Sequence, residues 1–339
     1  MDQQRKLAVS IGDERVSLAW VTGGANLAGV EKWPISRFST LTDALLAYER
    51  AAGIPLLGAA CVLGVLGATY GETIMLARGN WAISRSGLRS VFGRDAIVIN
   101  DVAARAWAVL GGAAPKLEPL SATATGSPDF RRTGRWGLTN IENGVGLAVI
   151  DVDDLGAVRV LECEMGHCGF APLTEQDQRL AAALMERARG LVSWEMVLTL
   201  AVDDPIWSAA GWPTARMPRI ATIARLVGRY LGDTVLAHGA WDGVIVTGRR
   251  IGELAAEAAL PDFNTGFESK PKFARLMRAA PRWRLPAQDL ALAGCAIALD
   301  HHPAVLSRDK AGQDRPPLSS LTSGGARPYS PTVTPGAAS

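Results

Sequence analysis

The chain has 339 residues, of which 48% are hydrophobic and 20% charged, a composition typical of globular proteins with room for two cores of domain size. A formal net charge of +2, with scattered basic residues, argues against a nucleic-acid partner. The four cysteines lie in a large chain without a recognisable secretory signal, so we expect reduced thiols and a cytoplasmic protein. No apolar run reaches the roughly 20 residues of a membrane span, and we expect no membrane partner.

Strand-like and helical patterns alternate in the N-terminal third. We expect strands at residues 7–11, 16–21, 59–66 and 96–99, and helices at 42–52 and 102–110. Residues 113–136 are rich in Pro, Ser, Thr and Gly, which predicts a crossover between domains.

A second α/β series follows this crossover. We expect strands at residues 146–150 and 243–247, and helices at 175–189, 218–238 and 251–259. The sequence therefore predicts an α/β protein with a small domain at residues 1–112 and a larger one at 113–289. After His302 the composition turns to Pro, Ser, Gly, Thr and Ala, which predicts a disordered tail at residues 303–339.

Two polar residues, Asn100 and Asp101, stand at the carboxyl end of an expected strand, where open α/β sheets present ligand-binding side chains. Asp101 suits a general base that accepts the proton of a substrate hydroxyl, with Asn100 holding a second hydroxyl. Taken alone, the position is explained more simply if Asp101 caps the helix that starts at Val102.

The run CEMGHCGFAP predicts a polar loop, because its two glycines and its proline disfavour a helix. Glu164 and His167 are spaced to hydrogen-bond adjacent hydroxyls of a sugar; otherwise they are a solvated carboxylate and an imidazole bonded to backbone. Zinc is a weaker interpretation, because Cys163, His167 and Cys168 lack a fourth ligand, and we expect no metal site built by the protein alone.

Several runs occur in the order and spacing of one known family. NWAISRSGLRSVFG followed by IVINDVAARAWAV resembles the bacterial glucokinase pattern of Asn, spaced Trp and Ser, Phe-Gly, and then Asn-Asp after a strand. GVGLAV resembles the family's second phosphate loop, EMGHCGFAP its Glu-Gly-Gly-His loop, and VSWEMVL its Val-Ser-x-Glu-x-x-Leu helix, which contains Glu195. With FNTGFESKPKFARLM and GCAIAL near the end, the resemblance covers roughly residues 5–300.

The resemblance implies two actin-like (ribonuclease H-like) domains with a cleft between them, the N-terminal one completed by a C-terminal helix at about residues 290–302. It implies ATP-dependent phosphorylation of glucose to glucose 6-phosphate, with Asp101 as the catalytic base. The sugar hydroxyls would be held by Asn100, Glu164, His167 and Glu195. The nucleotide would lie against the backbone of Gly12, Gly144, Gly146 and Gly248. ATP and Mg²⁺ would be the cofactors, and glucose or a similar hexose would be the ligand. A homodimer is one assembly that the chain could form.

The nucleotide-facing loops depart from the family pattern. Residues 10–15 read SIGDER where the family has Asp-x-Gly-Gly-Thr-Asn, which sets two carboxylates beside the expected phosphates. We expect this to weaken ATP binding unless Arg15 or magnesium compensates. Val145 replaces a threonine, TGRR at 247–250 replaces paired glycines and an apolar residue, and Met165 replaces a glycine, which we expect to narrow the sugar pocket.

These departures leave two hypotheses. The retained Asp101 favours an enzyme, whereas the altered loops favour a catalytically impaired, sugar-binding pseudokinase that senses a hexose by domain closure. A kinase that uses another donor, such as ADP or polyphosphate, also stays open. The helix-turn-helix and cysteine-rich zinc motif expected of related repressors are not found in the sequence, which argues against direct DNA binding.

Overall fold

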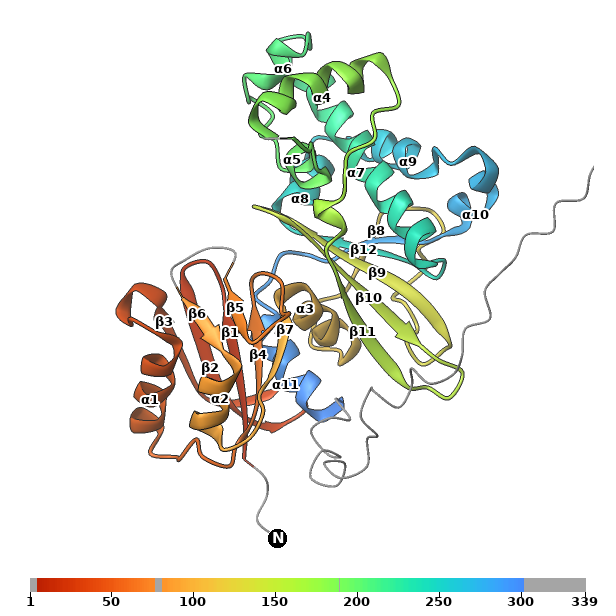
Figure 1. Cartoon of the computed structure of the whole chain (residues 1–339). Helices are drawn as coiled ribbons and strands as arrows, with labels where there is room; N and C mark the ends of the chain where they lie inside the picture. The colour runs from red at the N-terminus through yellow and green to blue at the C-terminus, as the bar shows by residue number, and fades with distance from the viewer. Residues whose placement is uncertain (1–4, 77–80, 189, 302–339) are drawn as a thin grey trace, which may run out of the picture. The chain divides into compact units, whose positions relative to one another are not determined.

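The computed structural model describes residues 5–76, 81–188 and 190–301, all within one compact unit, Met1–His301 (Figure 1). Asn80 of the first family motif and the tail predicted at residues 303–339 lie outside the described residues. No described helix is both long and apolar enough to cross a membrane.

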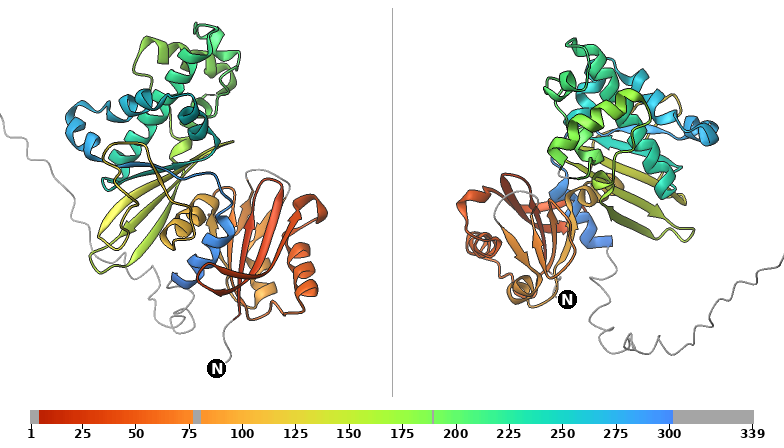
Figure 2. Two further views of the ribbon diagram at one scale, coloured as in Figure 1. Left: turned by 180° about the vertical axis from the view of Figure 1, so that it is seen from behind. Right: turned by 45° about the horizontal axis from the view of Figure 1, so that its top comes forward.

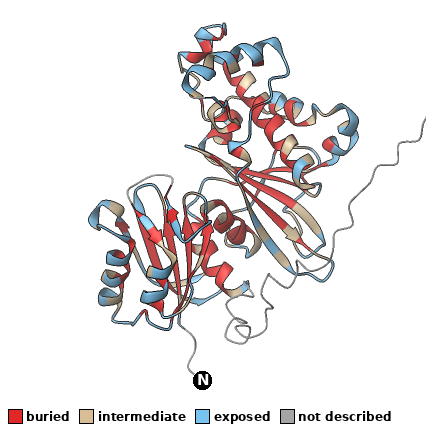
Figure 3. Ribbon diagram, in the orientation of Figure 1, coloured by how far each residue is buried: buried red, intermediate tan, exposed pale blue. Residues whose placement is uncertain are grey.

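The N-terminal half is built on a five-stranded sheet in the order β3-β2-β1-β4-β7. Its first three strands form an antiparallel meander, and β4 and β7 then add in parallel to β1. The strands are β1 (Lys6–Ile11), β2 (Arg15–Gly23), β3 (Asn26–Pro34), β4 (Ala60–Val65) and β7 (Ile97–Asn100). Nearly every residue of β1 and β4 is buried, as expected for strands covered on both faces (Figure 3).

Helices cover the two faces of this sheet. One face packs into a core with α1 (Leu41–Ala52), α2 (Arg85–Phe92) and the short hairpin of β5 (Thr73–Met75) and β6 (Ala82–Ser84). The other face packs against α3 (Asp101–Leu110) and α11 (Ala291–His301), which contact each other and β4. The last described helix thus returns to the N-terminal sheet, as Figure 2 shows from two further sides.

The C-terminal half repeats the pattern on a six-stranded sheet in the order β11-β10-β9-β12-β13-β8. Three antiparallel strands are again followed by two strands added in parallel, β12 and β13. β8 pairs antiparallel with β13 at the edge of the sheet. The strands are β8 (Glu118–Pro119), β9 (Gly134–Ile141), β10 (Val145–Val152), β11 (Val158–Cys163), β12 (Gly243–Thr247) and β13 (Arg282–Arg284).

A second hydrophobic core lies between this sheet and its helices, and α7 and α9 make the most extensive helix–helix contact. The helices are α4 (Glu175–Ala188), α5 (Trp194–Leu198), α6 (Ile206–Ala209), α7 (Arg216–His238), α8 (Arg249–Ala256), α9 (Leu260–Glu268) and α10 (Ala274–Ala279). A buried ion cluster adds to the core: Asp177 is fully buried and accepts from Arg225 at 2.7 Å and Arg229 at 3.0 Å.

The elements expected from apolar runs are present within a few residues, but others were missed. The expected crossover at 113–136 contains β8 and the start of β9, and the helix expected at 251–259 starts earlier, as α8 at Arg249. The unpredicted strands β3 and β11 have mostly exposed or half-buried residues, so they lack a clear apolar alternation.

Candidate active site

A pocket of about 560 Å³ is lined by residues of both sheets, a volume in the usual range of roughly 300–1,000 Å³ for small-molecule sites. Its lining residues come from the ends of β1 and β7, the turn between β9 and β10, the loop after β11, and α5. The predicted site residues that line it are Gly12, Asn100, Asp101, Gly144, Gly146, Glu164, His167 and Glu195. Gly248 is not among the lining residues.

Asn100, rather than Asp101, caps the helix at this site. β7 ends at Asn100, whose side-chain oxygen accepts the N–H of Ala103 at 2.6 Å. Asp101 is the first residue of α3, and the capping role considered for it is wrong. Its carboxylate lies in the pocket, 3.6 Å from Nε of Arg105 one helical turn further on.

The pKa of Asp101 is raised above its ordinary value of 3.8, chiefly by burial. Arg105 opposes this shift, while the nearby charge of Asp13 adds to it. A carboxylate with increased proton affinity, facing a pocket, has the properties of a general base.

Glu162, which was not predicted, joins the two sheets next to this carboxylate. From β11 its side chain accepts the backbone N–H of Asn100 at 2.8 Å and the hydroxyl of Thr69 at 2.5 Å. Burial raises the pKa of Glu162. The only sequence signal was its position two residues before Glu164, which places both on the same side of an extended segment.

The loop after β11 begins with a short helical turn, Met165–His167, and otherwise has the irregular form predicted for it. It brings Oε2 of Glu164 to 3.7 Å from Nε2 of His167, and both side chains are exposed. A side chain at Gly166 would place its Cβ 2.3 Å from the carbonyl oxygen of Val145, so the close approach of loop and strand requires glycine. Met165 packs against the second core and does not line the pocket, so it does not narrow it as expected.

Glu195 reaches the pocket from α5, which Ser193 caps by accepting the N–H of Met196 at 3.3 Å. The Glu195 carboxylate accepts the backbone N–H of Val145 at 2.9 Å, at the second phosphate loop. Main-chain bonds tie α5 to the His167 loop, including one from the N–H of Trp194 to the carbonyl of Cys168 at 3.0 Å. The two candidate sugar-binding segments are therefore held together.

The turn at residues 10–15, where the resemblance places a phosphate loop, lies at the same pocket, but its geometry does not require glycine at Gly12. A Cβ at Gly12 would meet only the carbonyl oxygen of Arg15, at 3.7 Å. Nδ2 of Asn143 donates to Asp13 at 3.4 Å, which joins this turn to the loop between β9 and β10. Arg15 is exposed and lines a different pocket, so the expected compensating cation is not directed to the site.

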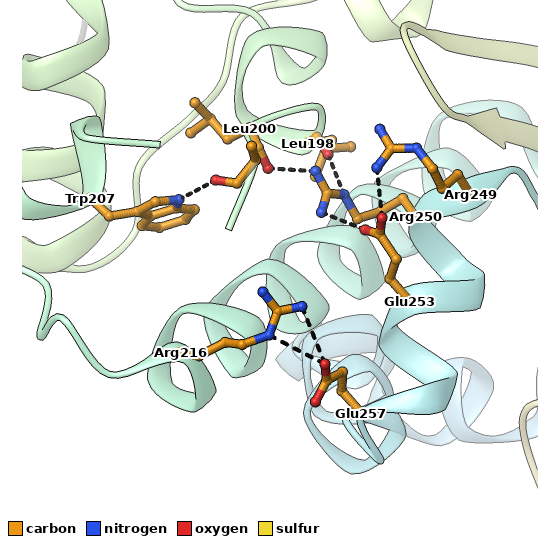
Figure 4. Close-up of polar contacts among 9 residues, drawn as sticks. Leu198, Leu200, Trp207, Arg216, Arg249, Arg250, Glu253 and Glu257 are labelled. Carbon is orange, nitrogen blue, oxygen red and sulfur yellow. Dashed lines mark hydrogen bonds and ion pairs between the residues drawn. The ribbon is translucent and has the colours of Figure 1, made fainter. Parts of the chain in front are cut away.

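The two arginines of the TGRR run both pair with Glu253, and only Arg250 of the two also donates to the main-chain carbonyls drawn in Figure 4. Arg250 is only 4% exposed; it donates to the carbonyl of Leu198 at 3.2 Å and to that of Leu200, just beyond the helix that contains Glu195. Arg249 is exposed and pairs with Glu253 at 2.6 Å. Gly248 has φ +100°, and a Cβ there would lie 2.3 Å from the carbonyl oxygen of Ile141, so glycine is required by the turn itself.

A profile of the glucokinase family matches residues 7–199 and 213–302. The chain belongs to the glucokinase family. The bifunctional protein glk of Burkholderia pseudomallei (strain 1710b) is 24% identical over 318 residues, covering 87% of this chain and 48% of that protein. The chain thus spans about half the length of that relative. The glucokinase of Xanthomonas campestris pv. campestris (strain B100) is 26% identical over 292 residues, covering 78% of this chain and 84% of that protein.

Solved glucokinase structures share the fold. A glucokinase from an Antarctic psychrotroph matches with a TM-score of 0.71 and 19% identity over 88% of this chain and 99% of that one. A glucokinase of Balamuthia mandrillaris in complex with glucose matches with a TM-score of 0.67 and 16% identity over 86% of this chain and 92% of that one. This confirms the predicted fold class, the α/β fold of the actin-like sugar kinases.

Proposed function

We propose that this chain is an ATP-dependent glucokinase that phosphorylates the 6-hydroxyl of glucose or a similar hexose, with Asp101 as the base. The observation that carries the proposal is a half-buried carboxylate of raised pKa, that of Asp101, in a pocket that also holds Asn100, Glu164, His167 and Glu195. Family membership supports the reaction, and the glucose bound by the Balamuthia mandrillaris glucokinase supports the substrate class.

In this reaction the 6-hydroxyl oxygen attacks the γ-phosphorus while Asp101 accepts the hydroxyl proton. The new bond joins the sugar oxygen to phosphorus, and the bond from phosphorus to the bridging oxygen of ADP breaks. Since Oδ1 of Asn100 accepts from Ala103, its Nδ2 is the group that would donate to a sugar hydroxyl. Glu164, His167 and Glu195 would bind the remaining hydroxyls and fix the ring for attack.

Magnesium fits this site only together with the nucleotide. No cluster of three or more His, Cys, Asp or Glu side chains suited to a metal occurs among the described residues. Mg²⁺ in kinases is commonly bound by one or two carboxylates plus substrate phosphates, and Asp13 lines the pocket beside the phosphate turn. We assign Asp13 to this role; the ion would neutralise charge on the phosphates.

We infer that the two sheets mark two domains, residues 1–112 completed by α11, and residues 113–289. The packing of α11 on β1, β4 and α3 supports this division. Closure of the domains over the sugar would exclude water, which competes as a phosphoryl acceptor.

The decisive experiment measures glucose 6-phosphate formation by the purified full chain with glucose, Mg²⁺ and ATP, beside Asp101→Ala. We expect turnover that the variant loses by at least about a hundredfold, with glucose affinity within a few-fold of the wild type. Undiminished activity of Asp101→Ala would refute the assignment of the base. Glucose binding without product formation would instead support the hexose-sensing pseudokinase.

A further inference from the structure

The pocket has a strong excess of negative charge, and Arg105 supplies its main positive group. Of the described lysines and arginines, Arg105 alone lines the pocket, together with His167. The acidic lining residues are Asp13, Asp101, Glu142, Glu164, Glu195 and Asp289. A nucleotide triphosphate would add further negative charge, so a phosphoryl-transfer site with this lining needs a cation near the transferred group.

Arg105 lines the pocket, and its contacts with the rest of the protein, the ion pair with Asp101 included, are long. The side chain is 20% exposed, and its buried Nε has no hydrogen-bond partner among the described residues. Nη1 makes one long contact, 3.5 Å, to the carbonyl of Gln288. Because buried donors are almost always satisfied, a buried Nε whose ion-pair partner Asp101 lies beyond hydrogen-bond distance, at 3.6 Å, indicates a missing acceptor.

The distance from Arg105 to the candidate base limits where that acceptor can lie. Nε is 3.6 Å from Oδ2 of Asp101. A base lies about 3 Å from the hydroxyl oxygen it deprotonates, and that oxygen attacks phosphorus from about 3–3.5 Å. The oxygens of the transferred group therefore lie within reach of a guanidinium beside Asp101.

We propose that Arg105 is a catalytic residue that donates hydrogen bonds to the transferred phosphoryl group. The proposal rests on the proposed kinase function and deepens it. It assigns the positive charge near the transferred phosphoryl group to Arg105 of α3 rather than to the altered phosphate turn. The planar guanidinium suits phosphate oxygens, and it stabilises the charge that they carry in the transition state. Asp101 and Arg105 stand four residues apart on one helix, a spacing at which side chains meet, but the sequence analysis did not single out Arg105.

The test compares Arg105→Met and Arg105→Lys with the wild type by kcat, KM for ATP, glucose affinity by calorimetry, and kcat as a function of pH. Arg275→Met, at an exposed site on α10, controls for general loss of positive charge. We expect Arg105→Met to lower kcat by roughly 100-fold, as for other removed transition-state donors, with glucose affinity within about threefold. Arg105→Lys should recover part of kcat, and Arg275→Met should match the wild type.

The pH profile separates phosphate contact from mere tuning of Asp101, whose other charged or titratable neighbours are Asp13 and Cys295. If Arg105 only tunes Asp101, kcat of Arg105→Met will return to the wild-type value at high pH, which would overturn the proposal. A kcat that stays low across the plateau supports it. If the wild type shows no turnover, the proposed function fails, and the affinity for MgATP then tests the phosphate contact of Arg105. Equal affinity in the wild type and Arg105→Met overturns that contact, whereas weaker binding by the variant supports it.

Discussion

The carboxylate of Glu195, predicted to bind sugar, accepts the backbone N–H of Val145 in the second phosphate loop at 2.9 Å. One side chain thus contacts the segment that we expect to face the nucleotide while lining the pocket that also contains Glu164 and His167. A hexose bound by the same carboxylate would therefore contact a group that is already bonded to this loop. This contact provides a direct physical route by which sugar binding can affect nucleotide binding.

Glu195→Ala is expected to weaken both glucose and MgATP binding, because it removes a sugar ligand and leaves the Val145 N–H without its acceptor. His167→Ala, in contrast, should weaken glucose binding alone, since its side chain is exposed and has no comparable bond to the phosphate loop among the described contacts. Calorimetric titration of each variant with each ligand measures the difference. Equal losses of MgATP affinity in both variants would contradict the route through Val145.

Glu162→Ala is expected to destabilise the fold by about 1–3 kcal/mol, because it leaves the Asn100 N–H and the Thr69 hydroxyl without their acceptor. It should also lower kcat, since the residue before Asp101 loses its anchor. Glu162→Gln keeps an acceptor oxygen of the same shape and should stay close to the wild type. Urea unfolding and steady-state kinetics test this, and an alanine variant as stable and active as the glutamine variant would rule out the anchoring role.

The pH dependence follows from the raised pKa of Asp101, which comes chiefly from burial, with Arg105 lowering it and Asp13 raising it. A base is active only when ionised, so kcat/KM should fall as the pH falls through a pKa above the ordinary 3.8. Asp13→Asn removes a negative neighbour, which lowers this pKa and should move the acid limb to lower pH, while the loss of the proposed Mg²⁺ ligand should lower the plateau of kcat/KM without moving the limb. The acid limb of kcat/KM in the two proteins is the measurement, and a shift to higher pH would contradict the assignment.

Arg250→Met should destabilise the protein because the carbonyls of Leu198 and Leu200 lose a buried donor, at a cost of roughly 1–3 kcal/mol for each unpaired group. The neighbouring Arg249→Met is the matched control: its ion pair is exposed, and its loss should change stability by no more than about 0.5 kcal/mol. Urea midpoints of the two variants give the comparison. Equal midpoints would show that the contacts of Arg250 do not stabilise the fold.

Apolar patterning predicted most of the buried strands and the long helices, but it missed β9 (Gly134–Ile141), whose centre is buried. β12 (Gly243–Thr247) is a buried apolar run, and α7 (Arg216–His238) is a long helix that is buried on all sides from Leu226 to Gly232. The edge strand β3 escaped prediction because most of its residues face solvent, and its pairing depends on the backbone of β2 rather than on its own side chains.

The sequence by itself determined which residue types stand at the ends of strands and in the glycine-containing loops, and their order pointed to the family. It did not determine which of them meet, because the pocket is assembled from segments more than a hundred residues apart, as Gly12 and Glu195 illustrate. Only the tertiary structure decided that Asn100 rather than Asp101 caps α3, that Arg250 supports α5, and that Arg105 rather than Arg15 lines the pocket. Each of these outcomes depends on side-chain direction and burial, which packing sets and local sequence does not.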